Sequence, residues 1–139
     1  MIKNNFTLEQ VNEFSKNSML GYLGIEITEI GDDFIKAKMP VDHRTKQPMG
    51  LLHGGASVVL AESLGSFGAT LTVDPKKQYC VGLEINANHI KSAKSGFVEG
   101  IARPAHLGKK TQVWEIKITN EDNQLVCISR ITMAVLDIK

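Results

Sequence analysis

One long apolar stretch constrains the fold of this chain more than any other feature. Nineteen consecutive positions, from Gly54 to Thr72, are almost all apolar or small, and Asp74-Pro75 follows them. A run of this length is too long for one strand and predicts a helix. Because the run is apolar on all sides, the helix is predicted to be buried. The small residues in it would let other elements pack close to its backbone, so we expect a fold built around this helix.

The rest of the chain carries strand patterns separated by turn signals. Two predicted strands precede the long helix and four follow it, which gives an α+β domain with an antiparallel sheet of about six strands wrapped on one helix. The predicted strands run from Ile25 to Ile30, Phe34 to Met39, Tyr79 to Ile90, Phe97 to Ala105, Thr111 to Thr119 and Leu125 to Leu136. In the third of these, we expect Val81, Leu83, Ile85 and Ala87 to share one face.

A second, shorter helix is predicted near the amino end, from about Leu8 to Lys16. Thr7 and Gln10 have the spacing of a capping box, and Phe6 and Val11 have that of a hydrophobic staple. Gly21 and Gly24 are expected to break the helical pattern after it.

Length and charge exclude several classes of protein. The 139 residues predict a single domain, residues 1–139, and the net charge of +1 argues against nucleic-acid binding. No secretory signal and no transmembrane segment is apparent, so we expect a cytoplasmic protein without a membrane partner. Cys80 and Cys127 lie in apolar strands and are expected to be reduced, buried thiols.

Glu62 is the residue that fits the long helix least. It is the single ionisable side chain between Gly54 and Val73. A carboxylate in a buried helix is costly unless it is paired or belongs to a site, so Glu62 is the first candidate for catalysis. A position at the surface or at a subunit boundary is the alternative. Ser66 lies one turn further along the same face and is a candidate partner; bonding to its own helix backbone is the alternative there.

The start of the same helix is the second candidate site. The sequence His53-Gly54-Gly55 leaves backbone N–H groups uncovered at a helix amino end, where they are unpaired and partially positive. Such groups can stabilise an oxyanion, although a tight loop-to-helix turn would explain the same glycines. The loop before them, residues 40–52, also carries Gln47, whose amide could donate to an oxygen.

Other catalytic patterns are missing from the sequence. The four histidines form no H-x-x-x-H pair and the cysteines are far apart, so no metal site is predicted. No G-x-S-x-G elbow, Walker sequence or dinucleotide-binding glycine pattern is present. We therefore expect no metal and no cofactor.

Several short sequences together resemble the hotdog-fold thioesterases. The resemblance is carried by Val41 to Thr45, Gln47-Pro48, Leu52 to Ser57, Ala61-Glu62-Ser63, Val81 to His89, His106-Leu107-Gly108 and Val113-Trp114. It is closest to the branch of 4-hydroxybenzoyl-CoA thioesterase, and in particular to the 1,4-dihydroxy-2-naphthoyl-CoA hydrolases of menaquinone synthesis. Thioesterases that clear misloaded aryl carrier proteins in siderophore synthesis are similar as well.

This resemblance implies a hotdog fold and a hydrolase acting on an acyl-CoA, most plainly an aromatic one. Glu62 corresponds to the family's nucleophile or general base, and the Gly54 N–H to the group that polarises the thioester carbonyl. Gln47 and His53 correspond to loop residues near that oxygen, and Ser66 to a hydroxyl that positions water or substrate. The resemblance further places Gly82 beside the pantetheine arm, and His89, Lys91 and Lys109 at the CoA nucleotide.

The resemblance also implies an assembly. Family members are homodimers, often paired into tetramers, with active sites at the dimer boundary. Three alternatives stay open: a proofreading thioesterase acting on an acyl or aryl carrier protein, a non-catalytic acyl-CoA binding module, and a hotdog dehydratase. The last would need a histidine paired with an acid, and the long helix carries Glu62 without a histidine.

Overall fold

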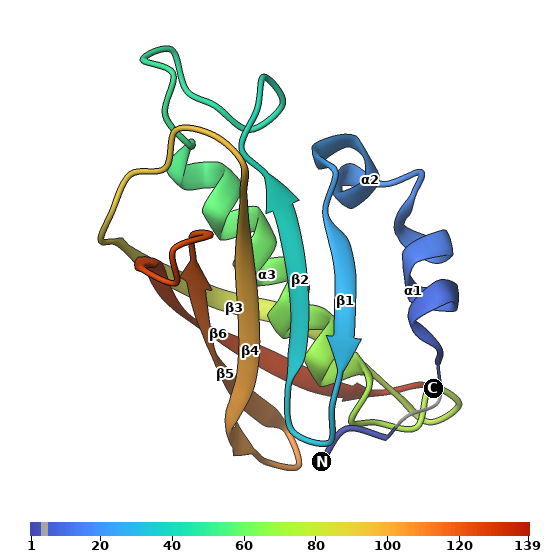
Figure 1. Ribbon diagram of the computed structural model, residues 1–139. Helices are drawn as coiled ribbons and strands as arrows, with labels where there is room; N and C mark the ends of the chain where they lie inside the picture. The colour runs from blue at the N-terminus through green and yellow to red at the C-terminus, as the bar shows by residue number, and fades with distance from the viewer. Residues whose placement is uncertain (4–5) are drawn as a thin grey trace.

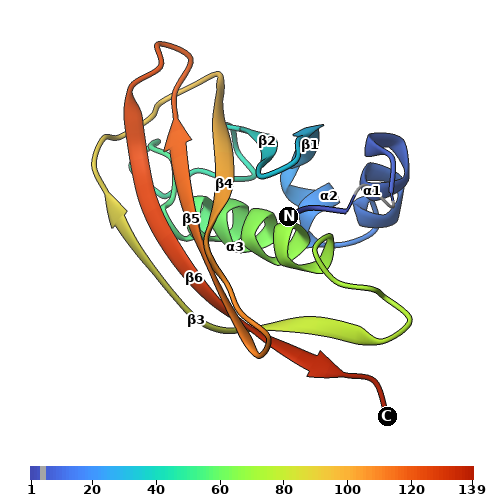
Figure 2. The ribbon, with the colours of Figure 1, turned by 90° about the horizontal axis from the view of Figure 1, so that it is seen from below.

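A computed structural model describes residues 1–3 and 6–139 and has one antiparallel sheet curved around one long helix (Figures 1 and 2). That helix, α3 (Gly54–Thr70), is two residues shorter than predicted. The six strands lie in the order β1-β2-β4-β5-β6-β3, and every neighbouring pair is antiparallel. Their bounds are β1 (Glu26–Ile30), β2 (Ile35–Pro40), β3 (Gln78–His89), β4 (Phe97–Leu107), β5 (Thr111–Thr119) and β6 (Leu125–Asp137). The predicted α+β class and strand number are confirmed.

The core forms where α3 lies against the concave face of the sheet. Leu60 and Leu64 on the helix are fully buried, as is Trp114 on β5. Gly68 makes this contact possible, because a Cβ atom there would lie 2.7 Å from the Trp114 ring. The small residues of the long apolar run therefore serve close packing of helix on sheet, as the sequence predicted.

Only one side of α3 is covered within the chain. Leu60, Ala61, Leu64 and Gly68 face the sheet and are buried, whereas Glu62 is exposed. The prediction of a helix buried on all sides is thus wrong for the single chain. The described residues cover the sheet-facing side and leave the side that carries Glu62 largely open.

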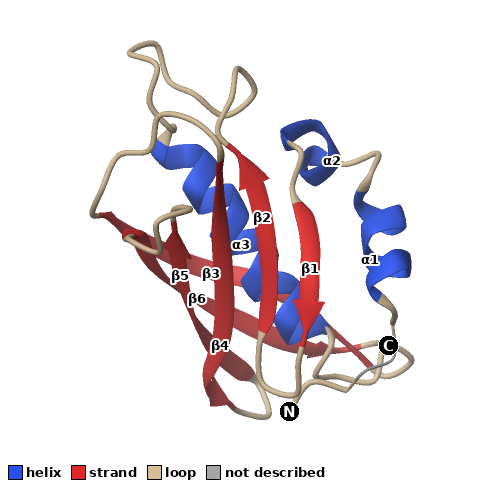
Figure 3. Ribbon diagram, in the orientation of Figure 1, coloured by secondary structure: helices blue, strands red, loops and turns tan. Residues whose placement is uncertain are grey.

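The amino-terminal segment packs beside β1 (Figure 3). Helix α1 (Leu8–Ser15) begins at Thr7 with the predicted capping box to Gln10, both of whose hydrogen bonds are present. The Asn12 side chain donates to the Ile27 carbonyl (2.9 Å) and accepts from the Ile27 amide (2.8 Å). A helical side chain therefore satisfies both backbone groups of a strand residue and fixes α1 against the sheet.

A second helix, α2 (Met19–Leu23), was not predicted. Gly21 lies inside it rather than breaking it, while Gly24 ends it with a left-handed backbone (φ 73°). Five residues with a central glycine give too short a pattern for a helix prediction. Gly24 is the C-terminal glycine that such a helix requires.

The face alternation predicted for β3 is also wrong in part. Between Gly82 and Glu84 the pairing with β6 shifts by one residue, so Leu83 is extra in a β-bulge. Ile85 packs against the core, whereas Val81 and Leu83 are exposed. A bulge moves all later side chains to the opposite face, which strict alternation cannot anticipate.

The two cysteines are free, with Cys127 buried and Cys80 half-buried. Burial raises the pKa of both thiols, so they remain protonated near neutral pH. The helices in the described part of the chain include none that is both long and apolar enough to cross a membrane.

Candidate active site

The loop before α3 fixes the orientation of the Gln47 amide. Its side-chain oxygen accepts from the backbone amides of Met49 (2.6 Å) and Leu51 (3.4 Å), while its own backbone N–H donates to the Leu51 carbonyl. The oxygen is thus used inside the loop. The side-chain nitrogen of Gln47 is the group left to donate to a substrate.

The amino end of α3 presents an open amide. His53 is the N-cap, and its Nδ1 accepts from the Gly55 N–H at 2.7 Å. No hydrogen bond between described residues uses the Gly54 amide. As the first residue of the helix, Gly54 has no acceptor within the helix either. His53 is exposed, and its side chain caps the helix.

His89, at the end of β3, lies directly over this helix start. A Cβ atom on Gly54 would be 2.9 Å from Nε2 of His89, so any larger residue would require the His89 ring to shift. The fold thereby brings together Gly54, His53 and His89 from a loop end and a strand end far apart in sequence. An uncovered N–H at a helix amino end, flanked by imidazoles, is suited to a partially negative oxygen.

Glu62 lies on the open side of α3, facing β3. One of its carboxylate oxygens is 3.2 Å from the point that a Cβ atom of Gly82 would occupy. No ion pair among the described residues involves Glu62. It borders a hollow of about 440 Å³ that Ser66 and Phe67 also line. A carboxylate without a cation, beside a strand glycine and a hollow, is available to a ligand.

Within one chain, Glu62 and Gly54 are too far apart to act on the same bond. They are eight residues apart on a continuous helix, which places them about 12 Å apart along the axis and rotated by roughly 80°. The predicted catalytic residues therefore form two clusters in the chain. Gln47, His53, Gly54 and His89 gather at the helix start, and Glu62, Ser66 and Gly82 gather near its middle.

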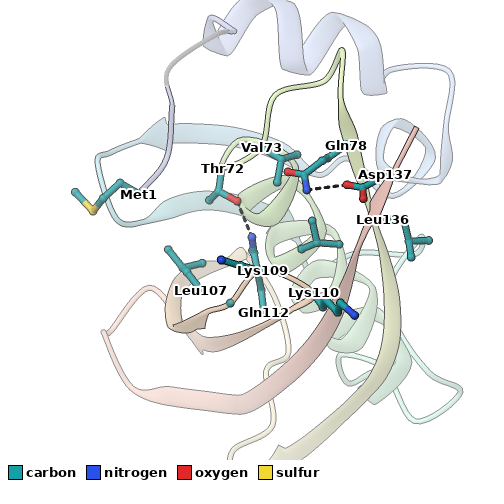
Figure 4. Close-up of a pocket in the computed structure, with 12 residues that line it drawn as sticks. Met1, Thr72, Val73, Gln78, Leu107, Lys109, Lys110, Gln112, Leu136 and Asp137 are labelled. Carbon is teal, nitrogen blue, oxygen red and sulfur yellow. Dashed lines mark hydrogen bonds between the residues drawn. The ribbon is translucent and has the colours of Figure 1, made fainter. Parts of the chain in front are cut away.

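The two lysines predicted at the CoA nucleotide are at opposite ends of the chain's fold. Lys91 is exposed just after β3, on the side of His89. Lys109 lies in the turn between β4 and β5, where it lines a hollow of about 770 Å³ with Thr72 and Gln78 at the carboxyl end of α3 (Figure 4). In the wall of this hollow, the Gln112 side-chain amide donates a hydrogen bond to the Thr72 hydroxyl (2.7 Å). The fold does not place Lys109 with His89 and Lys91 in one chain.

No group of three or more histidine, cysteine, aspartate or glutamate side chains in the described chain is arranged to hold a metal ion. The chemistry available at both clusters is that of amide donors, imidazoles, hydroxyls and one carboxylate.

Comparison with known proteins decides the family. The family model described as "Thioesterase superfamily" matches residues 49–127, which include every member of the two clusters except Gln47. The chain belongs to the thioesterase superfamily. It has the hotdog fold of that family, and it is a thioester hydrolase, as the sequence predicted.

Three relatives place the chain more closely. It is 54% identical to 1,4-dihydroxy-2-naphthoyl-CoA hydrolase of Escherichia coli (strain K12), over 96% of this chain and 98% of that protein. It is 48% identical to the proofreading thioesterase EntH of Cronobacter turicensis, over 96% and 97% of the two chains. A solved structure of a glutamine-to-alanine mutant of thioesterase PA1618 from Pseudomonas aeruginosa superposes with a TM-score of 0.96, at 50% identity and 99% coverage of both chains.

The sequence reasoning missed the contribution of α1 to the hollow beside Glu62. Phe14 and Ser15 from α1 line it, opposite Ser66 and Phe67. The signal was present in part, because the capping box located α1. Nothing in the sequence pattern related that helix to α3.

Proposed function

We propose that this thioester hydrolase acts on an aromatic acyl-CoA, 1,4-dihydroxy-2-naphthoyl-CoA or a related aroyl-CoA, with Glu62 as the catalytic carboxylate. The observation that carries the proposal is the position of Glu62, unpaired with any described cation, between Gly82 and a hollow. The E. coli relative named for this substrate supports the aromatic acyl group.

In the proposed reaction, the Gly54 N–H and the Gln47 side-chain nitrogen donate to the thioester oxygen and stabilise its negative charge as the carbonyl is attacked. Glu62 either attacks the carbonyl carbon or removes a proton from a water that does so. If water attacks, its oxygen bonds to the carbonyl carbon, the C–S bond breaks, and the proton taken by Glu62 passes to the departing thiolate of CoA. If Glu62 attacks, the C–S bond breaks to leave a mixed anhydride, and water then cleaves that anhydride, which frees Glu62 and supplies the proton for the thiolate. Water and the chain's own groups supply all the chemistry.

The separation of Gly54 from Glu62 leads us to propose a homodimer as the catalytic unit, or a homotetramer built from such dimers. β3 is an outer strand of the sheet, with Val81 and Leu83 exposed on it. Two copies paired antiparallel along β3 would run their α3 helices in opposite directions. Each Glu62 could then face the helix start of the other copy, which would join the two clusters.

Replacing Glu62 tests the catalytic role. We expect Glu62→Gln and Glu62→Ala to lower kcat by about 10²- to 10⁴-fold, because a general base or nucleophile is lost. The assay is thiol release from 1,4-dihydroxy-2-naphthoyl-CoA, 4-hydroxybenzoyl-CoA, benzoyl-CoA and a straight-chain acyl-CoA. Glu29→Gln on β1 is the control, because the Glu29 carboxylate pairs with Lys36 at the surface and lines neither hollow. Near-wild-type activity in both Glu62 variants would refute the assignment.

Mixing two inactive variants tests whether one site draws on two chains. Gln47→Ala chains and Glu62→Gln chains, each inactive alone, are refolded together. If Gln47 and Glu62 of one site come from different copies, mixed dimers contain one intact site, and activity returns to roughly a quarter of wild type. Sites built within a single chain would show no such recovery.

Hydrolysis of an aryl group from a carrier protein is the second candidate function, and the EntH relative favours it. The same aroyl group would be presented on CoA and on a carrier protein. A higher kcat/KM for the carrier-bound form would assign the proofreading function, and a higher value for the CoA form would support the first proposal.

A further inference from the structure

Two hollows lie between α1 and α3 and share three of their lining residues, and the first of them borders Glu62. The first, of about 440 Å³, has Glu62 and Ser66 at its mouth. The second, of about 330 Å³, continues to Phe6 and Leu71. Phe14, Phe67 and Thr70 line both hollows. Below, "the α1–α3 groove" means these two hollows together.

Three polar side chains follow one another along the α3 side of the groove. Glu62, Ser66 and Thr70 follow one another at intervals of four residues, so each lies one turn beyond the last, and the row rotates by roughly 80° about the helix axis between Glu62 and Thr70. From Glu62 to Thr70 the row is about 12 Å long. That length suits a bicyclic acyl group that extends from a thioester carbonyl held beside Glu62.

Helix α1, which forms the other side of the groove, is fixed in position but exposes an aromatic side chain. Val11 is 5% exposed, and the two Asn12 hydrogen bonds to Ile27 fix the helix against β1. Phe14, on the same helix, is 84% exposed although it lines the groove. A fixed helix that exposes an aromatic ring beside a hollow offers apolar area that a ligand can cover.

The hydroxyl groups in the groove differ in how they are used. Those of Ser63, Ser15 and Ser18 donate to backbone carbonyls. By contrast, no hydrogen bond between described residues uses the Thr70 hydroxyl. The lining of the second hollow is almost wholly apolar, so a ligand would reach the Thr70 hydroxyl from the first hollow, which Glu62 and Ser66 also line.

We infer that the α1–α3 groove binds the acyl part of the thioester and selects a hydroxylated aromatic ring. This inference rests on the proposed function and assigns two residues to specificity, Phe14 and Thr70. Phe14 and Phe67 contact the ring, since aromatic pairs have favourable stacked and edge-to-face arrangements. The Thr70 hydroxyl bonds to a hydroxyl on the ring, because a few placed polar groups in an apolar pocket fix ligand orientation. Helix α1 thus sets the size and polarity of the acyl group that reaches Glu62.

Substrate ratios test the two residues separately. kcat/KM is measured for 1,4-dihydroxy-2-naphthoyl-CoA, 2-naphthoyl-CoA, benzoyl-CoA and hexanoyl-CoA. Phe14→Trp narrows the groove and is expected to lower the naphthoyl-to-benzoyl ratio by about tenfold or more. Thr70→Val keeps the shape and is expected to lower the dihydroxynaphthoyl-to-naphthoyl ratio by roughly 3- to 10-fold, the value of one hydrogen bond. Both ratios should stay at wild-type values in Tyr22→Ala, which removes an aromatic side chain, 75% exposed on α2, that lines neither hollow.

Binding measured without turnover separates this inference from the proposed function. Calorimetry with a hydrolysis-resistant naphthacyl thioether of CoA should give a Kd about tenfold higher for Phe14→Ala than for wild type or Tyr22→Ala. An unchanged Kd would refute binding of the acyl group in the α1–α3 groove, whether or not the wild type hydrolyses thioesters. A changed oligomeric state with unchanged Kd would likewise overturn it, by assigning Phe14 to a contact between copies. Absence of hydrolysis with the expected Kd pattern would refute only the proposed function.

Discussion

At the scale of single residues, Glu62 and Gly82 depend on each other across a narrow gap. We expect Gly82→Ala to lower kcat, because the added methyl would lie 3.2 Å from the Glu62 carboxylate and push it from its place. The melting temperature should change little, since alanine is tolerated in a strand at least as well as glycine. Steady-state kinetics and thermal unfolding of one sample check this. A normal kcat would show that Glu62 can move without consequence.

A second residue-scale prediction concerns the loop before α3. Three hydrogen bonds from the Arg44 side chain and one from its backbone N–H hold the pKa of Asp42 down, to about 2. Because the pKa of Asp42 is lower in the folded protein than in the unfolded chain, its ionised carboxyl stabilises the folded loop at pH values above the ordinary carboxyl pKa. This stabilisation is lost as the pH falls through the folded-state pKa. NMR titration of the Asp42 carboxyl should show the low pKa. In Arg44→Ala it should return toward its ordinary value; a midpoint unmoved by Arg44→Ala would contradict the pairing.

At the scale of elements, Asn12 is the joint between α1 and the sheet. We expect Asn12→Ala to lower the free energy of unfolding by about 1–3 kcal/mol, because the Ile27 amide and carbonyl both lose their side-chain partner. Denaturant unfolding measures the loss, and hydrogen exchange should be faster at the Ile27 amide. Glu13→Ala, on the same helix and paired only at the surface with Lys16, is the control and should cost less. An equal decrease in the free energy of unfolding in both variants would show that Asn12 does not fix α1 to the sheet.

Elements with a long, unbroken pattern were predicted well and those with local irregularity were not. β5 has the predicted bounds because its apolar and polar residues alternate from Trp114 to Thr119, and burial alternates along the whole strand. α2 was missed because one turn of helix leaves no periodicity to detect. The β3 bulge at Leu83 was missed because its cause is pairing with β6, a contact between distant parts of the chain.

The candidate site was predictable as a set of residue types but not as an arrangement. Gln47 and Gly54 were candidates because a loop amide and an uncovered helix-start N–H can each donate to an oxygen, although a tight turn would also explain the glycine. Glu62 stood out because the helix around it is apolar. Their separation along α3, and the position of Lys109 beyond its far end, depend on tertiary structure. For the same reason α3 looked buried on all sides, since the sequence does not distinguish burial within a chain from burial between chains.

At the scale of the whole molecule, the proposed dimer predicts that assembly and activity are lost together. Leu83 is 61% exposed at the β3 bulge. We expect Leu83→Lys to yield monomers, because like charges would face each other across the two-fold axis. Analytical ultracentrifugation and thiol release check this on one preparation. Ile138→Lys, at a chain end and 49% exposed, should leave both unchanged; an active Leu83→Lys monomer would rule out the shared site.

The bond between Asn12 and Ile27 has a consequence for how far such a sheet can extend. A sheet with two bare margins can add strands on both and grow into a fibre. Here the outer strand β1 has its Ile27 amide and carbonyl already engaged by a helix of the same chain, whereas β3 has no such cover among the described residues. Pairing between strands of two copies is therefore favoured at β3 only. Once two copies have paired through β3, neither has another free edge strand of this kind. Helix α1, which lines the groove beside Glu62, thus also prevents strand pairing between copies at β1 and limits the size of the assembly.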